Sequence, residues 1–206
     1  MFSPDRINNA ADISTKLNLT NESLTSPTTS LGGSSYLLTL GDAPLGATYS
    51  AASMSSVPII GTALDDILTS EGSGDDSLIG LDGHDTLRSL GGVDFLFGSA
   101  GDDLLDAGDF ADWLYGDAGN DTLITGTWVD PENVPEIQGF DARFDSLVIY
   151  YKAGDGGALE VSIDDNEAIR LQTIKFNGVS VATVDYGEGS RVARASIQLV
   201  ASNDFV

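Results

Sequence analysis

A nine-residue phrase recurs along the middle of this chain, and it constrains the fold more than any other feature. Between Gly61 and Ile124 seven copies can be aligned, with Ser70 as the only residue between copies. The sixth position is always Asp, at Asp66, Asp76, Asp85, Asp94, Asp103, Asp112 and Asp121. The eighth position is always Leu, at Leu68, Leu78, Leu87, Leu96, Leu105, Leu114 and Leu123. Such a register is not expected of an acidic linker, so the segment is a structural repeat.

Each copy divides into a turn and a short strand. The first six residues are turn formers that end in Asp, and the last three carry one Leu between variable residues. Because strand side chains alternate, the Leu points inward, and stacked copies bury a Leu ladder that no single copy could bury alone. Two copies then make one coil. The pattern predicts an all-β protein built on a right-handed parallel β-roll, with an N-terminal cap and a C-terminal β region on either side.

The stacked Asp residues create an electrostatic problem. At the strand spacing of a parallel sheet, the Asp of one copy lies close to the Asp two copies later. At roughly 5 Å and an effective dielectric constant of about 20, each such pair of ionised carboxylates costs about 3 kcal/mol. Five such pairs are expected, from copies one and three through copies five and seven, so the roll needs a counter-ion.

Calcium (Ca²⁺) fits this need better than other metals. The chain has no Cys and a single His, which excludes thiolate sites and zinc sites that need two histidines. Calcium accepts roughly six to eight oxygen ligands in a flexible shell, whereas magnesium demands a tighter octahedral geometry. We expect about five calcium ions, one for each pair of carboxylates. The predicted ligands are the seven repeat Asp residues and the turn glycines Gly72, Gly74, Gly80, Gly83, Gly92, Gly98, Gly101, Gly108, Gly116 and Gly119.

The repeats resemble the pattern G-G-x-G-x-D-x-U-x, where U is a large aliphatic residue, of the RTX (repeats-in-toxin) or hemolysin-type calcium-binding family. The resemblance covers residues 61–124. It departs from the pattern at Leu64 and Phe110, which stand where Gly is expected, and at Ser89-Leu90, which opens copy four. These turns are the ones expected to bind calcium weakly or to leave a site empty.

The segments on either side of the repeats suggest three parts. Residues 1–57 form a cap rich in Ser and Thr, residues 58–126 form the roll, and residues 127–206 form the C-terminal β region. One strand is expected in the cap, over residues 35–40. In the C-terminal region strands are expected at 146–151, 159–163, 169–176, 179–184 and 197–200. Asn177-Gly178, between two of these strands, predicts a type I′ hairpin.

The C-terminal region is also similar to the β segments that follow RTX repeats in secreted proteins, at residues 137–141 and 145–147. Its last residues, 203–206, are similar to the acidic-then-apolar ending of type I secretion substrates. The sequence shows neither a signal-peptide pattern nor a run of apolar residues long enough to span a membrane. These features alone also suit a cytoplasmic protein. The resemblance implies export by type I secretion machinery and folding outside the cell, where calcium is available.

Charge and motifs narrow the function. The formal net charge of −23 disfavours nucleic acid and anionic membranes as partners. His84 lies at the fifth position of its turn, where a solvent-facing role is expected rather than a catalytic one. Residues 1–57 are too few and too polar to hold a catalytic domain, so we expect a non-enzymatic protein.

Three functions are then open: an extracellular structural or self-assembling subunit (surface layer, matrix or filament), an extracellular adhesin or glycan-binding module, and an accessory part of a secreted hydrolase or toxin. Phe95, Phe97 and Trp113 occupy variable strand positions. They either form an exposed stripe for a partner or pack under a terminal segment.

Overall fold

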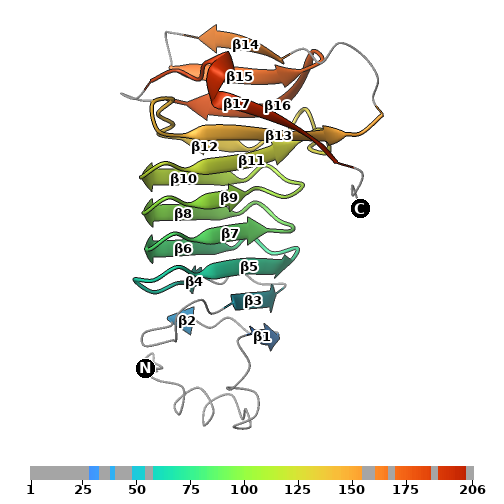
Figure 1. Ribbon diagram of the computed structural model, residues 1–206. Coiled ribbons are helices and arrows are strands. Elements are labelled where there is room, and N and C mark those ends of the chain that lie inside the picture. The colour runs from blue at the N-terminus through green and yellow to red at the C-terminus, as the bar shows by residue number, and fades with distance from the viewer. Residues whose placement is uncertain are drawn as a thin grey trace, which may run out of the picture.

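A computed structural model shows the chain as an elongated stack of β coils (Figure 1). It describes residues 28–32, 38–39, 48–53, 58–154, 161–166, 170–186 and 190–202. Successive strands of the repeat region alternate between two sheets, and within each sheet they pair in parallel. The predicted parallel β-roll is therefore confirmed.

The first sheet, called sheet A, runs the length of the roll. In spatial order its strands are β1 (Thr28–Gly32), β3 (Thr48–Ser53), β5 (Ile67–Gly72), β7 (Thr86–Ser89), β9 (Leu104–Asp106), β11 (Thr122–Gly126), β13 (Ser146–Lys152) and β17 (Ile197–Ser202). A short 3-10 helix, η1 (Arg194–Ser196), leads into β17.

The second sheet, sheet B, lies opposite. From the N-terminal end its strands are β2 (Leu38–Thr39), β4 (Pro58–Ile60), β6 (Ser77–Asp82), β8 (Phe95–Ala100), β10 (Trp113–Ala118), β12 (Glu136–Gln138), β16 (Val179–Asp185), β15 (Leu171–Phe176) and β14 (Val161–Asn166). β15 is antiparallel to both β14 and β16, and β14 is the last strand at this end of the sheet.

The repeat leucines form the core between the sheets, as predicted. All seven are at most 1% exposed. In sheet A, Leu68, Leu87, Leu105 and Leu123 stand in register. In sheet B the same holds for Leu78, Leu96 and Leu114. Each repeat strand thus contributes one inward Leu, and the side chains on either side of it are more exposed, except for Ile124 in β11, which is buried.

The stacking continues beyond the repeats in both directions. In sheet A, β3 pairs with β5 at the N-terminal side, and β13 pairs with β11 at the C-terminal side. The Leu ladder is extended by Leu147 in sheet A and by Ile59 and Ile137 in sheet B. The two sheets therefore cross the expected boundaries at residues 57/58 and 126/127, and the three-part division stays a prediction.

The C-terminal strands lie close to their predicted positions. The predicted runs 146–151, 179–184 and 197–200 correspond to β13, β16 and β17, and the described parts of the other two correspond to β14 and β15. The hairpin between β15 and β16 turns at Asn177 and Gly178, whose φ angles are 51° and 81°. Two successive positive φ angles are those of a type I′ turn, so this prediction is confirmed. Of the predicted strand 35–40 the structure describes only β2, and residues 203–206 lie outside the described residues.

Candidate metal centre

The repeat aspartates lie at the two sides of the roll, in the turns that connect the sheets. Segments 61–66, 80–85, 98–103 and 116–121 lead from sheet B to sheet A and are called the B-to-A turns. Segments 70–76, 89–94 and 107–112 lead from sheet A to sheet B and are called the A-to-B turns. All seven aspartates are at most 2% exposed.

Except for Asp112, whose N–H donates to the carbonyl of Phe110, each repeat Asp donates its backbone N–H to the carboxylate of the Asp one coil further along the chain. In the B-to-A turns the backbone N–H of Asp66 donates to Oδ1 of Asp85 over 2.8 Å, and Asp85 and Asp103 repeat this bond toward Asp103 and Asp121. In the A-to-B turns the N–H of Asp76 donates to Asp94 over 2.6 Å, and that of Asp94 to Asp112 over 2.8 Å. The structure thus brings the seven aspartates into two columns of adjacent carboxylates, as the stacking argument requires.

Ionised carboxylates are poorly tolerated in these columns. Burial raises the pKa of Asp85 and Asp94 to about 7, and the neighbouring aspartates of each column add to the shift. Burial likewise raises the pKa of Asp112 and Asp121 to about 6. Near neutral pH the columns therefore need a positive charge beside them, because removing a carboxylate from water disfavours its ionised form.

The buried oxygens show where such a charge fits. Among the described residues, Oδ2 of Asp85, Asp103 and Asp121 has no hydrogen-bond partner. Each of these oxygens faces the glycine that opens its own turn: a Cβ at Gly80, Gly98 or Gly116 would overlap Oδ2 of Asp85, Asp103 or Asp121, respectively. A buried acceptor without a donor is costly, and a hard cation that takes oxygen ligands relieves that cost.

Several of the predicted turn glycines pack against the backbone carbonyl of a glycine one coil earlier. Positive φ angles occur at Gly83 (122°), Gly92 (103°), Gly101 (141°), Gly108 (59°) and Gly119 (152°). A Cβ at Gly101 would overlap the carbonyl oxygen of Gly83, and one at Gly119 would overlap that of Gly101. Gly72 and Gly74 present their carbonyl oxygens to Gly91 and Gly92 in the same way. Only glycine allows this close stacking, which lines each side of the roll with backbone oxygens.

The carboxylates that could bind a metal ion stand in pairs of neighbouring Asp residues rather than in larger clusters. Among the described residues no three His, Cys, Asp or Glu side chains come together as a metal-binding group. The groups that would hold a cation here are the carboxylates of consecutive Asp residues in one column and the carbonyls of the turns. This is the oxygen-only, flexible shell that suits calcium. Calcium would supply the positive charge between the coils.

Asp145 belongs to the B-to-A column, although the nonapeptide count ends before it. The N–H of Asp121 donates to its Oδ1 over 3.1 Å, and the N–H of Asp141 donates to its Oδ2 over 2.7 Å. The signal was present in the sequence, because Asp145-Ser146-Leu147 keeps the Asp-x-Leu spacing of the repeats. The A-to-B column ends instead at Pro135, because Glu136 donates to the carbonyl of Asp112 as Thr86 does to that of Asp66.

His84 is an exposed turn residue, as predicted. Its backbone N–H donates to Oδ1 of Asp65 over 2.8 Å, and its Nδ1 accepts the N–H of Asp102 over 2.8 Å. Its side chain thus takes part in a second, exposed ladder of turn residues that links neighbouring coils.

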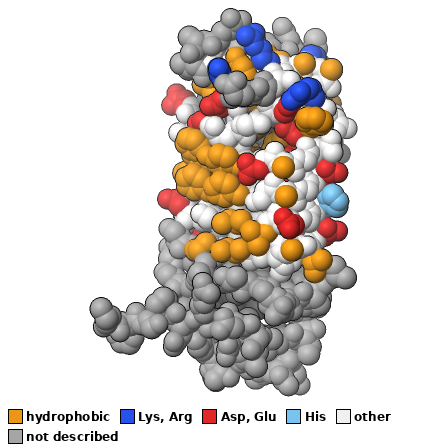
Figure 2. All heavy atoms as spheres, turned by 90° about the vertical axis from the view of Figure 1, so that its left-hand side faces the viewer, with side chains coloured by type: hydrophobic (Ala, Val, Ile, Leu, Met, Phe, Trp, Pro, Cys, Tyr) orange, Lys and Arg blue, Asp and Glu red, His pale blue; other side chains and the backbone are white. Residues whose placement is uncertain are grey.

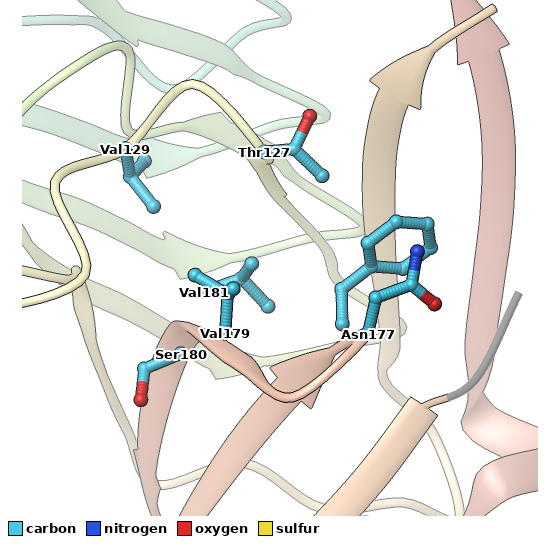
Figure 3. A pocket seen from close by; sticks show the side chains of 7 residues that line it. Thr127, Val129, Asn177, Val179, Ser180 and Val181 are labelled. Atoms are coloured by element: carbon cyan, nitrogen blue, oxygen red, sulfur yellow. The ribbon is translucent and has the colours of Figure 1, made fainter. Parts of the chain in front are cut away.

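A cavity of about 260 Å³ lies beside the β15–β16 hairpin, between it and residues 127–129 (Figure 3). Its lining residues are Thr127, Val129, Phe176, Asn177, Val179, Ser180 and Val181. None of them is an acid, a base or a thiol, so this lining offers no general acid or base.

The parallel roll and its columns of buried carboxylates define a calcium-binding β-roll. Residues 72–105 and 97–127 match the RTX calcium-binding nonapeptide repeat, in 4 copies. The chain therefore carries calcium-binding nonapeptide repeats of the RTX type, and the resemblance seen in the sequence is confirmed. No curated protein matches the chain. Within the described residues no helix has the length and apolarity needed to cross a membrane.

Proposed function

We propose that this is a secreted, non-enzymatic protein whose roll folds when calcium binds, and that it serves as an extracellular structural or self-assembling subunit of a surface layer, matrix or filament. The observation that carries the proposal is the pair of buried Asp columns, in which Oδ2 of Asp85, Asp103 and Asp121 finds no hydrogen-bond partner within the described part of the chain.

Calcium-triggered folding follows from the columns. One set of the hydrogen bonds that join the coils at the turns ends on carboxylates, so the coils cannot stack in this way without bringing these groups together. In the unfolded chain the same groups are solvated and apart. Binding that occurs only in the folded state stabilises that state by mass action, so calcium should act as a folding switch.

Secretion supports such a switch, because the extracellular medium supplies calcium at the concentrations that extracellular calcium modules use, roughly 10⁻⁴ to 10⁻³ M. A chain that remains unfolded inside the cell can pass through type I secretion machinery and fold outside. Calcium and this machinery are therefore the proposed partners.

The terminal strands of both sheets support self-assembly. Among the strands that the structure describes, sheet A ends at β1 and β17, and sheet B ends at β2 and β14. An edge strand presents backbone N–H and C=O groups that can pair with a strand of another copy. Because the strands stack along the axis of the roll, such pairing would extend the stack into a filament (Figure 1).

The test is a calcium titration followed by far-ultraviolet circular dichroism and light scattering, with magnesium as the control. We expect the β signal to rise cooperatively with calcium and not with magnesium, and scattering to rise with it. A chelated protein that is already fully folded would contradict the folding switch. A calcium-loaded protein that stays monomeric at all concentrations would contradict the structural subunit.

The aromatic side chains of sheet B favour the second candidate, an extracellular adhesin or glycan-binding module. Phe97 stacks on Tyr115 with 4.7 Å between ring centroids, and Phe95 on Trp113 with 6.0 Å. Phe95 is 38% exposed, so these rings do not all pack under other segments. Figure 2, which faces the ends of β6, β8 and β10, shows hydrophobic side chains gathered in one area beside acidic ones.

A polysaccharide co-sedimentation assay separates the two candidates. An adhesin should bind as a monomer in calcium and lose binding in the variant Phe95→Ala, whereas Ile67→Ala, an equally exposed apolar position on sheet A at 42%, should retain it. The structural subunit should show no such binding.

A further inference from the structure

The stack of coils continues past the last repeat. Because β12 pairs with β10 and β13 pairs with β11, the segment 139–145 takes the place of a further B-to-A turn next to the last repeat turn, 116–121 (Figure 1). Like the repeat turns it opens with glycine, Gly139, and closes with aspartate, Asp145. It lies beyond residue 127, where the match to the calcium-binding repeat ends.

In the repeats, the open carboxylate oxygen of a B-to-A turn faces the coil that follows it. A Cβ at Gly80 would overlap both Oδ2 of Asp85 and the carbonyl oxygen of Gly98. A Cβ at Gly98 would likewise overlap Oδ2 of Asp103 and the carbonyl oxygen of Gly116. Each of these carboxylate oxygens therefore shares a small space with a carbonyl of the next coil.

Asp121 is the last repeat Asp of this column, so the coil that its open oxygen faces is not a repeat. A Cβ at Gly116 would overlap Oδ2 of Asp121, which gives this oxygen the same place in its turn as those before it. Asp121 is 1% exposed, and its Oδ2 has no hydrogen-bond partner among the described residues. Only a group bound against the turn 139–145 can satisfy this oxygen.

The turn 139–145 brings a second carboxylate to Asp121. The N–H of Asp121 donates to Oδ1 of Asp145 over 3.1 Å. Burial raises the pKa of Asp121 to about 6, and Asp145 is the neighbouring charge that adds most to this shift. Within the described part of the chain neither carboxylate pairs with a basic side chain, and Arg143 of the same turn pairs with Asp141 instead. The two buried carboxylates thus face each other without a counter-charge.

A cavity of about 500 Å³ lies between the two turns. It is lined by residues 117–120 of the last repeat turn and by Gly139, Asp141, Phe144 and Asp145 of the turn that follows. The second turn has one residue more than the first, seven instead of six, and this leaves room beside Asp145. Both oxygens of Asp145 accept a backbone N–H group, but each carboxylate oxygen has a second lone pair for a metal ion.

We propose that calcium binds in a further site between Asp121 and Asp145, which the turn 139–145, outside the nonapeptide repeats, closes. The two carboxylates supply the negative charge, and turn carbonyls and water complete the oxygen shell. The inference rests on the proposed calcium-driven folding and adds a site to those expected from the repeats. Since β13 begins directly after Asp145, the ion ties the C-terminal β region to the roll.

The first test counts the ions bound at saturation by native mass spectrometry, with calcium alone. We expect Asp145→Asn and Asp121→Asn each to lose one ion, and the double variant to lose no more than one, because the two residues share it. Asp121→Asn keeps the Oδ1 that accepts the N–H of Asp103 and changes only the oxygen that has no protein donor. The control is Asp117→Asn, which removes one charge from the same cavity at an exposed residue. It should keep the wild-type ion count, since Asn tolerates its φ of 67°.

The second test is limited trypsin digestion in saturating calcium, because the chain has a basic residue in each part. Arg143 lies exposed in the turn, and Arg88 is the only Lys or Arg among residues 58–126. Cleavage after Arg143 therefore reports release of the turn, and cleavage after Arg88 reports unfolding of the roll. In Asp145→Asn and Asp121→Asn we expect cleavage after Arg143 to be about tenfold faster than in the wild type, with cleavage after Arg88 unchanged. Asp117→Asn should match the wild type at both sites.

Wild-type ion counts and wild-type cleavage in both site variants would overturn the further site while leaving calcium-driven folding intact. A double variant that loses two ions would also overturn it, because the residues would then serve separate ions. A wild-type chain that binds no calcium would overturn both proposals. If Asp145→Asn is cleaved after Arg88, its roll has not folded, and Asp121→Asn decides alone.

Discussion

Replacing Leu105 by Ala should lower the free energy of unfolding of the calcium-loaded roll by about 3 to 4 kcal/mol. Leu105 is 0% exposed and stands in register between Leu87 and Leu123. The change deletes three carbon atoms, which is worth about 2.4 kcal/mol at about 0.8 kcal/mol each. The coils on either side are held at the spacing of the sheet hydrogen bonds, so the cavity cannot close, and its cost adds to the transfer term.

The assay is urea unfolding at saturating calcium, followed by far-ultraviolet circular dichroism and extrapolated to zero denaturant. The matched control is Leu90→Ala, because Leu90 lies in an A-to-B turn and is 41% exposed. Its effect should stay within about 0.5 kcal/mol. If Leu105→Ala destabilises the protein no more than Leu90→Ala does, the Leu ladder is not the core of the roll.

Other perturbations address the charge and the turns. Burial raises the pKa of Asp85 and Asp94 from 3.8 to about 7, so their ionisation opposes calcium-free folding fully above about pH 7, and this penalty fades toward pH 4. In the presence of a calcium chelator, acidification from about pH 8 to pH 5 should therefore raise the β signal in circular dichroism, and an unchanged signal would refute this. With calcium present, the same acidification should weaken calcium binding, because protons compete for the carboxylate ligands. Gly98→Ala should weaken calcium binding in calorimetry, because its Cβ would displace Oδ2 of Asp103, and an unchanged affinity would contradict that geometry. Gly178→Ala, at φ 81° with open space around the new Cβ, should cost about 1 to 2 kcal/mol in thermal unfolding without changing calcium affinity.

The sequence predicted the parts of the fold that repeat. The Leu at the eighth position of each copy and the Asp at the sixth position were enough to place the core and the two columns of carboxylates. Because both recur with the same period of nine residues, stacking the copies aligns the Leu residues and the Asp residues together. Asn177-Gly178 was enough for the hairpin, since few other residue pairs tolerate two positive φ angles.

The parts that do not repeat were less predictable. Asp103 and Asp121 are 18 residues apart, which is two nonapeptides, but Asp121 and Asp145 are 24 residues apart. A search for the nine-residue period therefore does not find Asp145. Ser70 looked like a spacer between two copies, although the structure gives it the same place as Ser89. That equivalence depends on strand register, which an added residue in the 70–76 turn hides from a one-dimensional alignment.

The hydrogen bonds between the aspartates all point the same way along the chain. In the B-to-A turns the N–H of each repeat Asp needs the carboxylate of the coil after it, and the series ends where the N–H of Asp145 donates to the carbonyl of Asp141. The N–H of the residue after each Asp donates the other way, as that of Thr86 does to the carbonyl of Asp66 and that of Leu104 does to the carbonyl of Asp85. A roll that stops at either face therefore leaves a buried N–H group without its acceptor, at a cost of about 1 to 3 kcal/mol. The two faces differ in what they require of the next coil: the face toward the C-terminus needs a carboxylate, and the face toward the N-terminus needs a backbone carbonyl.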